Sequence, residues 1–248
     1  MELSLVTIYR RRAHHLQTLL QWWQQQANYH AHYEWIVVEA DTRPTSGLAQ
    51  TLQQHQVRYD FLPNQGTLHK TRALNRGLQL AHGRYAAPLD VDLIPYGETL
   101  ACHHHLATLS DELLITGYRL MSPQTDLDVT QLPQAIEQAA IAPEDQPTAL
   151  RKHLLRGEKF GVMPFFCRQR LIDIQGWDEA FIGWGAEDQD LIERYLGQRR
   201  TLCRSPHLVY LHLHHDAEPH WREAETIASN RQTYYQKRQG PMGSSPEA

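Results

Sequence analysis

Apolar segments of strand character alternate with helical patterns along roughly the first third of this 248-residue chain. We expect strands at residues 3–9, 34–39 and 57–62, helices at 13–26, 47–55 and 71–82, and a fourth strand that ends at Asp90-Val91-Asp92. Such alternation predicts an α/β fold with a parallel sheet and crossover helices. Ligands of such sheets bind outside the carboxyl ends of the strands. The polar residues at those ends are Tyr9, Glu39, Asp41, Asp90 and Asp92.

Asp90 and Asp92 follow an apolar run that Pro95 stops. Two carboxylates at a strand end suit a hard divalent cation, because oxygen ligands bind Mg²⁺ and Mn²⁺ well. Such a cation neutralises phosphate charge on a diphosphate and stabilises its departure. The same pair could merely cap a loop, so it needs support from elsewhere in the chain.

A second acidic cluster begins a predicted amphipathic helix and comprises Glu187, Asp188 and Asp190. The helix dipole favours carboxylates in a first turn, and this effect alone could explain them. It does not explain Trp184, which has a glycine on either side. A large aromatic residue between two glycines suits a mobile loop that covers a flat ligand such as a sugar ring. The segment therefore favours a functional interpretation.

Composition excludes several classes of protein. Lys and Arg number 24 against 28 Asp and Glu, so the net charge of -4 provides no basic field for nucleic acid. The isolated cysteines, three in number, indicate a reducing compartment rather than a disulfide framework. No apolar run approaches the roughly 20 residues that span a bilayer, and residues 1–12 lack the pattern of a signal peptide. We expect a cytoplasmic protein without a transmembrane segment.

The two acidic motifs resemble those of the β-1,4-galactosyltransferase family and of related bacterial, family 2-like glycosyltransferases. The likeness is most specific at residues 90–95, Asp-Val-Asp-Leu-Ile-Pro, and at residues 183–188, Gly-Trp-Gly-Ala-Glu-Asp. It covers about residues 3–98 and 158–236 and leaves 99–157 unmatched. The resemblance implies the GT-A (nucleotide-diphospho-sugar transferase) fold, an α/β fold with a mixed, mostly parallel central sheet flanked by helices.

The same resemblance implies one GT-A domain over residues 1–239. Its nucleotide-sugar-binding half would be 1–98, followed by a variable acceptor-side insertion at 99–157 and an acceptor and catalytic half at 158–239. Within the insertion, residues 112–119 read as a strand and 148–156 as a helix. The Gly-, Pro- and Ser-containing tail at 240–248 is expected to be disordered.

Roles for the donor site follow from the resemblance. Asp92 resembles the metal-bound aspartate, and Asp90 the carboxylate that contacts the ribose or the metal's outer ligands. The remaining residues expected to contact the nucleotide sugar are Tyr9, Arg10, Arg12, Lys70 and Trp184. From the residues alone, Arg10 and Arg12 could instead belong to a solvated basic turn.

On the acceptor side, the resemblance makes Asp188 the general base and gives Glu187 a hydrogen bond to the acceptor. Both would be catalytic residues, and Trp184 would close over the donor and acceptor sugars. A base here takes a proton from the acceptor hydroxyl while the donor sugar develops positive charge. Retaining relatives with a similar loop tend to have asparagine where Asp188 stands, so the carboxylate favours inversion.

Histidine is abundant, at 16 residues, and most copies are not expected to bind metal. His103 begins a run of three histidines that we expect at the start of a solvated helix. In the resembled family two further metal ligands, spaced three apart, follow a late strand, and His212 and His215 have that spacing. On a regular strand His212 and His214 would share a face, which makes His214 a competing ligand. Imidazole suits Mn²⁺, with Mg²⁺ as the other candidate.

The sequence thus predicts a metal-dependent inverting glycosyltransferase that moves a sugar from a UDP-sugar donor to a carbohydrate or glycoconjugate acceptor. Galactose and N-acetylgalactosamine are the expected sugars. One alternative is a non-catalytic protein that binds a nucleotide sugar or carbohydrate on the same fold. Another is an Asp-x-Asp phosphohydrolase, but such enzymes usually carry the motif on their first strand. The acceptor and the oligomeric state are not determined by the sequence.

Overall fold

A computed structural model describes residues 1–216 and 223–239 of the chain. Five strands form the first sheet in the order β3-β2-β1-β4-β8. They are β1 (Leu3–Tyr9), β2 (Tyr33–Asp41), β3 (Arg58–Pro63), β4 (Tyr85–Pro88) and β8 (Phe166–Cys167). The pairings among β1 to β4 are parallel, and only β8 joins antiparallel. The α/β class and the mostly parallel sheet are therefore confirmed, and the predicted strands match within a few residues.

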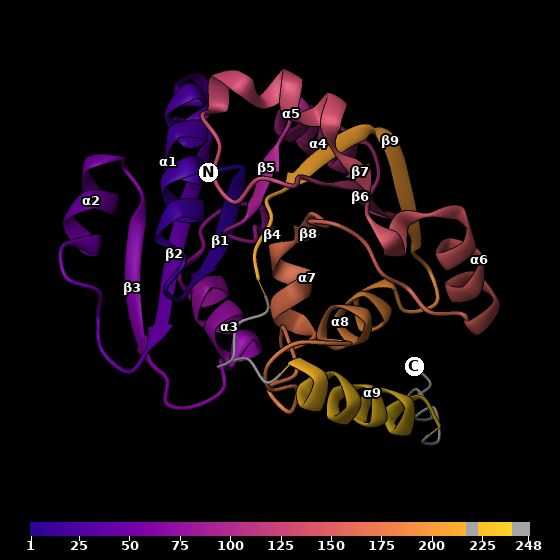
Figure 1. Ribbon diagram of the computed structural model, residues 1–248. Helices are drawn as coiled ribbons and strands as arrows, with labels where there is room; N and C mark the ends of the chain where they lie inside the picture. The colour runs from indigo at the N-terminus through magenta and orange to yellow at the C-terminus, as the bar shows by residue number, and fades with distance from the viewer. Residues whose placement is uncertain (217–222, 240–248) are drawn as a thin grey trace.

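Helices cover both faces of this sheet (Figure 1). They are α1 (Ala13–Gln25), α2 (Leu48–Gln54) and α3 (Lys70–Leu80). Alternate residues of β1 point to opposite faces, so Leu3 and Leu5 pack in the same core cluster as Leu16 of α1. Val6 instead packs against Leu74 of α3. The fully buried β2 contributes to both layers, with Trp35 and Val37 in the cluster of Leu16 and with Ile36 and Val38 in a cluster that includes Ala73 of α3.

A second sheet has the order β5-β9-β6-β7. It consists of β5 (Leu93–Pro95), β6 (Leu113–Met121), β7 (Ala140–Ile141) and β9 (Thr201–His212), and three of these strands lie at the upper right of Figure 1. β9 pairs antiparallel with β5 and parallel with β6. The pairing places His212 opposite Leu93, directly after the Asp-x-Asp turn. The sequence did not predict how these strands pair, because both pairings of β9 join segments more than 80 residues apart.

The remaining helices come after β5 in the chain. They are α4 (Thr99–Thr108), α5 (Leu132–Gln138), α6 (Pro147–Arg156), α7 (Arg168–Asp173), α8 (Glu187–Leu196) and α9 (Glu223–Gln239), with short 3₁₀ turns η1 (Ala27–Tyr29), η2 (Val129–Gln131) and η3 (Pro143–Asp145). The tail predicted at 240–248 lies outside the described residues. Among those that are described, no helix combines the length and hydropathy needed to cross a membrane. The expected cytoplasmic location stays a prediction.

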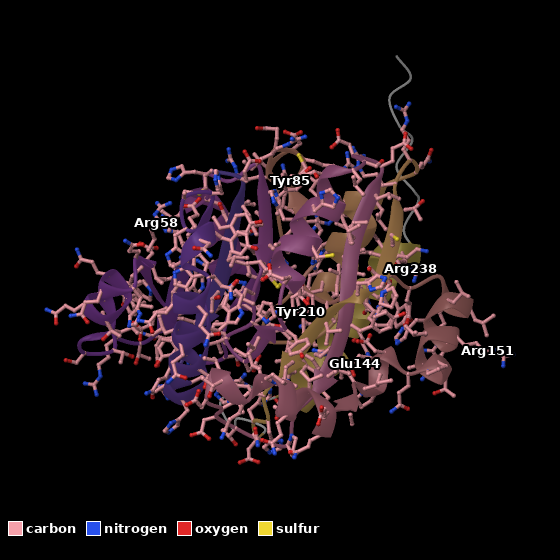
Figure 2. All side chains as sticks on the ribbon, turned by 90° about the horizontal axis from the view of Figure 1, so that it is seen from above. Arg58, Tyr85, Glu144, Arg151, Tyr210 and Arg238 are labelled. Carbon is pink, nitrogen blue, oxygen red and sulfur yellow. The ribbon has the colours of Figure 1, made fainter. Side chains whose placement is uncertain are left out.

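One sequence-based expectation fails in α4. His103 does not begin a solvated helix but lies in the middle of α4 with no exposed surface. Its Nε2 donates to the carbonyl of Ile115 at 3.0 Å, so its Nδ1 must accept from the hydroxyl of Tyr210 at 2.5 Å. Tyr210 lies near the centre of the molecule in Figure 2, and the imidazole stacks on Phe165 with ring centroids 3.8 Å apart. These partners satisfy its polar atoms, so His103 acts as a core residue.

Candidate active site

A cavity of about 240 Å³ lies where the carboxyl ends of β1 and β4 meet the end of β9. Its lining contains most of the predicted donor and metal residues, namely Arg10, Arg12, Lys70, Asp90, Asp92, Trp184, His212 and His215. It also contains Ile8, Leu68, Val91, Arg119, Met121 and Glu144. The cavity is thus lined by side chains of both charges, with basic residues close to a small group of carboxylates.

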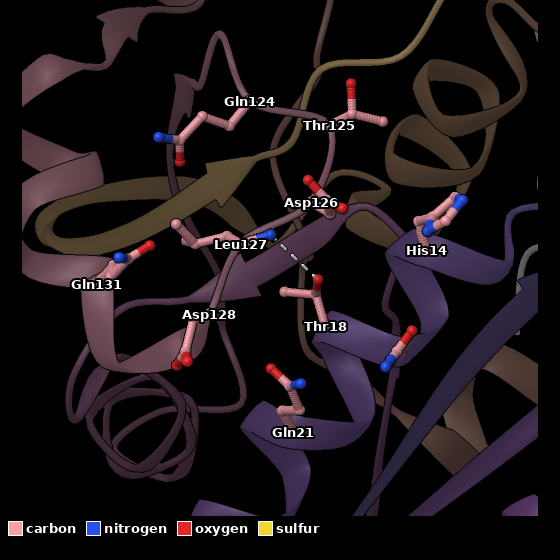
Figure 3. A pocket seen from close by; sticks show the side chains of 10 residues that line it. His14, Thr18, Gln21, Gln124, Thr125, Asp126, Leu127, Asp128 and Gln131 are labelled. Carbon is pink, nitrogen blue, oxygen red and sulfur yellow. Dashed lines mark hydrogen bonds between the residues drawn. The ribbon is translucent and has the colours of Figure 1, made fainter.

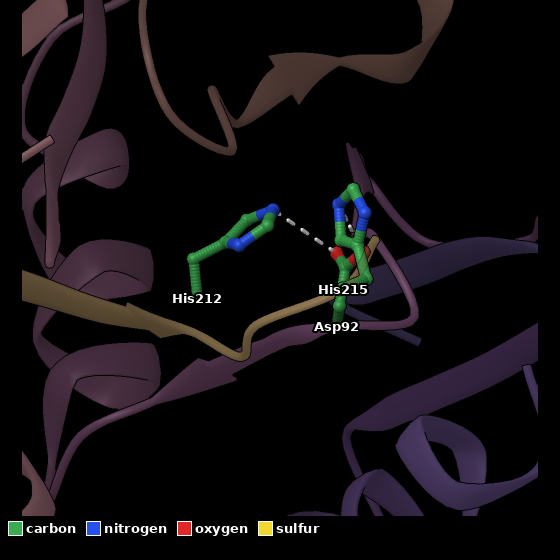
Figure 4. A group of neighbouring side chains, drawn as sticks. All are labelled: Asp92, His212 and His215. Carbon is green, nitrogen blue, oxygen red and sulfur yellow. Dashed lines mark ion pairs between the residues drawn. The ribbon is translucent and has the colours of Figure 1, made fainter. Parts of the chain in front are cut away.

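Asp92, His212 and His215 form a compact group in this cavity (Figure 4). One potential ligand atom from each residue lies within 4.8 Å of the others. His212 Nε2 is 3.5 Å from one carboxylate oxygen of Asp92, and His215 Nε2 is 3.4 Å from the other. Two imidazole nitrogens and a carboxylate oxygen are a donor set for a divalent transition metal.

The charges of this group suit a metal site. Burial alone would raise the pKa of Asp92, but the positive charges of His212 and Arg12 outweigh it, so the pKa lies below its ordinary value. Burial lowers the pKa of His212 despite the nearby Asp92 carboxylate. A neutral imidazole beside an ionised carboxylate is the protonation state that metal binding requires. His212 Nδ1 is also buried without a hydrogen-bond partner among the described residues.

His214, the competing ligand, lies outside the group. β9 ends at His212, so the alternation that would have placed His212 and His214 on one face stops there. The His214 side chain is 53% exposed, and its backbone N–H donates to the carbonyl of Gln124 at 2.7 Å. Its own carbonyl accepts from His15 Nε2 at 3.0 Å. The structure therefore brings His212 and His215 together and turns His214 away.

The arginines after β1 are not a solvated basic turn. Arg10 is buried and donates to the carbonyl of Gly66 at 2.9 Å. Arg12 is buried against Asp92, with which it forms a close ion pair. Only Arg11 between them is exposed, and its guanidinium binds Asp41 on β2 at 2.6 Å. Arg10 and Arg12 thus present positive charge to the cavity from a rigid turn.

Tyr9 differs from the other predicted donor residues. It is 3% exposed and belongs to the hydrophobic core on the α1 side of the sheet. Burial and the neighbouring Glu39 carboxylate raise the pKa of its hydroxyl. Its two neighbours in the chain, Ile8 and Arg10, line the cavity, and Tyr9 does not. The structure therefore places Tyr9 beneath the site and not on its surface.

The two acids that begin α8 have different environments. Glu187 is buried, and its Oε1 accepts from Lys70 Nζ at 2.9 Å while its Oε2 accepts from the Gly185 amide at 2.7 Å. The Asp188 side chain is 44% exposed and lies 3.5 Å from the same Lys70. Its other oxygen accepts from Trp177 Nε1 at 3.4 Å. The nearby carboxylates raise the pKa of Lys70 well above its ordinary value despite its burial. Because its side chain is more exposed than that of Glu187, Asp188 is the acid that a ligand can reach.

Trp184 lines the cavity with its side chain and is 43% exposed. Its neighbours have backbone conformations that favour glycine, with φ of +78° at Gly183 and +114° at Gly185. Ala186 also has a positive φ, of 63°, before α8 begins. The loop thus turns sharply on both sides of Trp184, which lines the cavity.

Sequence reasoning missed two charged residues of the cavity, Arg119 and Glu144. Arg119 lies on β6, near the end of the strand predicted at 112–119, and forms a close ion pair with Glu144 on η3. The rule that ligands bind at the ends of strands could have found Arg119. Glu144 lies in the unmatched insertion and carried no signal, because only the folded chain brings η3 beside β6.

A separate open groove of about 520 Å³ runs between α1 and the segment after β6. Its lining is polar and comprises His14, Gln17, Thr18, Gln21, Gln124, Thr125, Asp126, Leu127, Asp128 and Gln131 (Figure 3). Thr18 accepts a hydrogen bond from the Leu127 amide at 3.4 Å and joins the two walls. Among the described residues, its lining shares none with the cavity that holds Asp92.

Comparison with protein families identifies the chain. The model described as glycosyl transferase family 2 matches residues 4–167. The chain belongs to glycosyl transferase family 2. A second model, described as the N-terminal domain of galactosyltransferase, matches residues 150–216. That match spans the Gly-Trp-Gly loop, the acids of α8 and both candidate histidines. The expected resemblance is thus confirmed, and no curated protein sequence matches the chain.

Solved structures with the same fold confirm the GT-A architecture. A mannosyltransferase from Pyrobaculum calidifontis, PcManGT, in complex with GDP-Man and Mn²⁺, is 14% identical with a TM-score of 0.67 and covers 99% of this chain and 66% of its own. GalNAc-T7 with UDP, GalNAc and Mn²⁺ is 13% identical with a TM-score of 0.66 and covers 95% and 48%. TarS from S. aureus is 16% identical with a TM-score of 0.59 and covers 86% and 37%. The chain therefore spans from about a third to two thirds of these relatives.

Proposed function

We propose that this family 2 protein is a metal-dependent inverting glycosyltransferase with a UDP-sugar donor and a carbohydrate or glycoconjugate acceptor. The observation that carries the proposal is the joining of two groups in one cavity. Asp92, His212 and His215 lie on one wall, and Trp184 lies on another beside the helix that carries Asp188. Galactose and N-acetylgalactosamine remain the proposed sugars, supported by the match to the galactosyltransferase model.

The residues present fit a bound divalent cation. Asp92, His212 and His215 would hold it, and Nδ1 of His212 is buried without a hydrogen-bond partner in the part of the chain that the structure describes. We propose Mn²⁺ over Mg²⁺, because nitrogen ligands suit manganese better than magnesium, which prefers oxygen. When bound, the ion neutralises negative charge on the donor's diphosphate. Solved structures of GT-A relatives contain Mn²⁺ with GDP-Man or UDP, which supports this choice.

The protein's own cations would bind the rest of the diphosphate. Arg10, Lys70 and Arg119 all line the cavity, and each is held by a partner within the protein, namely the Gly66 carbonyl, Glu187 and Glu144. Their positions are therefore set before a ligand arrives, which reduces the ordering cost of binding. We propose that Asp90, the exposed member of the acidic pair, contacts the ribose or the outer ligands of the metal.

Asp188 is the proposed general base. Its carboxylate is partly exposed in the first turn of α8, and one of its oxygens accepts a hydrogen bond from the indole N–H of Trp177. The other oxygen, whose contact with Lys70 Nζ is a long one of 3.5 Å, can accept the proton of an acceptor hydroxyl as that hydroxyl's oxygen bonds to the anomeric carbon. The bond from that carbon to the diphosphate breaks on the opposite face, and the diphosphate leaves with the electron pair. Direct displacement of this kind inverts the anomeric carbon.

Glu187 is less suited to the acceptor contact that the resemblance implies. Both of its oxygens already accept hydrogen bonds within the protein, from Lys70 and from the Gly185 amide. We propose that it positions Lys70 and the loop, and that Asp188 and Trp184 contact the acceptor. The insertion at 99–157 would add to the same surface, since Arg119, Met121 and Glu144 already line the cavity.

A donor screen tests this proposal. The protein is incubated with UDP- and GDP-sugars in the presence of Mn²⁺, and release of the nucleotide is measured. We expect release from a UDP-sugar, its loss in excess chelator and its return with Mn²⁺. Asp92→Asn, His212→Ala and His215→Ala should each abolish release, whereas the matched control His214→Ala should not. Full activity in chelator, or equal losses in all four variants, would contradict the metal site. Retention of the anomeric configuration in the product would contradict the assigned displacement.

A further inference from the structure

Helix α9 packs against the Gly-Trp-Gly loop and beside α8 (Figure 1). The clearest contact comes from Asn230, which is 4% exposed. Its side-chain amide donates to the carbonyl of Ile182 at 3.0 Å and to that of Trp184 at 3.2 Å. One buried group thus ties together two carbonyls on either side of Gly183, and water cannot readily replace it.

The loop glycines are required by this helix. A Cβ atom added at Gly183 would lie 2.6 Å from Thr226 Cγ2, and one added at Gly185 would lie 3.2 Å from the Cα of Ile227. Both distances are shorter than ordinary van der Waals contact. The glycines that flank Trp184 therefore allow the backbone to approach α9 closely as well as to adopt positive φ.

Farther along α9, Lys237 contacts residues on both sides of the Gly-Trp-Gly loop. Lys237 Nζ binds Asp178, before the loop, at 2.7 Å and also forms a close ion pair with Asp190 in the first turn of α8. The Tyr234 hydroxyl donates to Glu193 at 2.5 Å. α9 therefore holds the loop backbone from outside, while the indole of Trp184 stays exposed on the cavity side. The mobility of this loop, expected from the sequence, stays a prediction.

We propose that Asn230 is a positioning residue for Trp184 and Asp188, acting through the backbone of the loop without touching the substrate. The inference rests on the proposed function, because it assigns to α9 the geometry of that site. The path is short. Asn230 holds the Trp184 carbonyl, and the next amide, that of Gly185, donates to Glu187, which precedes Asp188 at the start of α8. A shift of the loop backbone would displace the ring and the base together.

The test uses Asn230→Asp, which keeps the shape of the side chain but cannot donate either hydrogen bond. Tyr234→Phe is the matched control, because it removes hydrogen bonds of the same helix, to Glu193 and from Arg238, that do not involve the Trp184 loop. We expect Asn230→Asp to speed amide hydrogen exchange in residues 182–187 and to lower kcat for nucleotide release roughly 10- to 100-fold, as small misplacements do. Its Kd for UDP with Mn²⁺ should stay within about two-fold. Tyr234→Phe should change neither the loop's exchange nor kcat.

A double-mutant cycle separates positioning from general damage. In a Trp184→Ala background, Asn230→Asp should lower kcat much less than in the wild type, since part of its effect is exerted through the missing ring. Unchanged loop exchange in Asn230→Asp, unchanged kcat, or equal losses in Tyr234→Phe would each overturn the inference. Absence of nucleotide release by the wild type would instead overturn the proposed function, and loop exchange would still decide whether Asn230 anchors the loop.

Discussion

At the scale of single residues, two neighbours in the chain differ in how far their side chains are buried. Glu187 and Asp188 are adjacent, yet the first is buried against Lys70 and the second is exposed to ligand. Consecutive helical residues point about 100° apart, so Glu187 is buried against Lys70 at 2.9 Å, whereas Asp188, 3.5 Å from the same lysine, stays 44% exposed. This difference supports the proposed role of Asp188, rather than Glu187, as the general base.

Asp188→Asn should lower the rate of sugar transfer by roughly 10² to 10⁴, the usual contribution of a general base. The amide keeps the size of the side chain but cannot take the acceptor's proton. Donor binding, measured by calorimetry with UDP and Mn²⁺, should persist. Asp173→Asn on α7, which exchanges one exposed acid for an amide, is the control. Near-normal transfer by Asp188→Asn would contradict its role.

His103 should make stability depend on pH. Burial lowers its pKa from 6.5 to about 3, so between these values the unfolded chain binds a proton that the folded protein does not. The unfolding free energy contributed by this residue therefore falls as pH drops below 6.5, by up to about 1.4 kcal/mol per pH unit. Urea unfolding at several pH values between 6.5 and 4.5 measures the slope.

The His103→Gln variant isolates this contribution, because glutamine keeps a donor and an acceptor but does not titrate. Its unfolding free energy should fall less steeply with decreasing pH than that of the wild type. Equal slopes in the two proteins would show that His103 is not buried in its neutral form.

At the scale of elements, α3 approaches β1 so closely that only glycine fits between them. A Cβ atom at Gly77 would lie 2.2 Å from Cγ1 of Val6, at the centre of the sheet. This approach places the first residue of α3, Lys70, at the cavity beside the acids of α8. A glycine in the middle of a helix thus serves the site by allowing close packing.

Gly77→Ala should therefore lower the unfolding free energy, by about 1–3 kcal/mol for overpacking of a dense core. The higher helix propensity of alanine opposes this by at most about 1 kcal/mol. Denaturant unfolding measures the difference. The control is Gln79→Ala on the exposed face of α3, which should stay within about 0.5 kcal/mol of the wild type. Greater stability of Gly77→Ala would contradict the close contact.

At the scale of the whole molecule, the two halves of the chain are interleaved. β8, from the second half, pairs with β4 of the first sheet, and β9 lies between β5 and β6 of the second. The candidate metal ligands come from both halves, Asp92 from one and His212 from the other. Each sheet thus combines strands from both halves of the chain.

We therefore expect residues 1–239 to unfold in one cooperative transition. Far-UV circular dichroism, which reports both sheets, and tryptophan fluorescence, which reports Trp22, Trp23 and Trp35 of the first core, should give coincident curves. Two separated transitions would instead divide the chain into independent domains. Added UDP with Mn²⁺ should raise the midpoint of the single transition, because ligands of the folded state stabilise it.

Local sequence patterns were enough to predict β1 to β4, the helices between them and the start of α8 at Glu187, because alternation, caps and chain breaks are read within a few residues. They also placed both acidic motifs at the ends of elements. The motifs and the resemblance together gave the family, the GT-A fold and most of the cavity residues.

Only the tertiary structure decided that His215, and not His214, lies beside Asp92 and His212, because the end of β9 and its pairing with β5 determine where the strand's alternation stops. It also buried Glu187 and His103, added Arg119 and Glu144, and brought Asn230 against the Trp184 loop. Each of these outcomes depends on contacts between segments far apart in the chain, and no local pattern records such contacts.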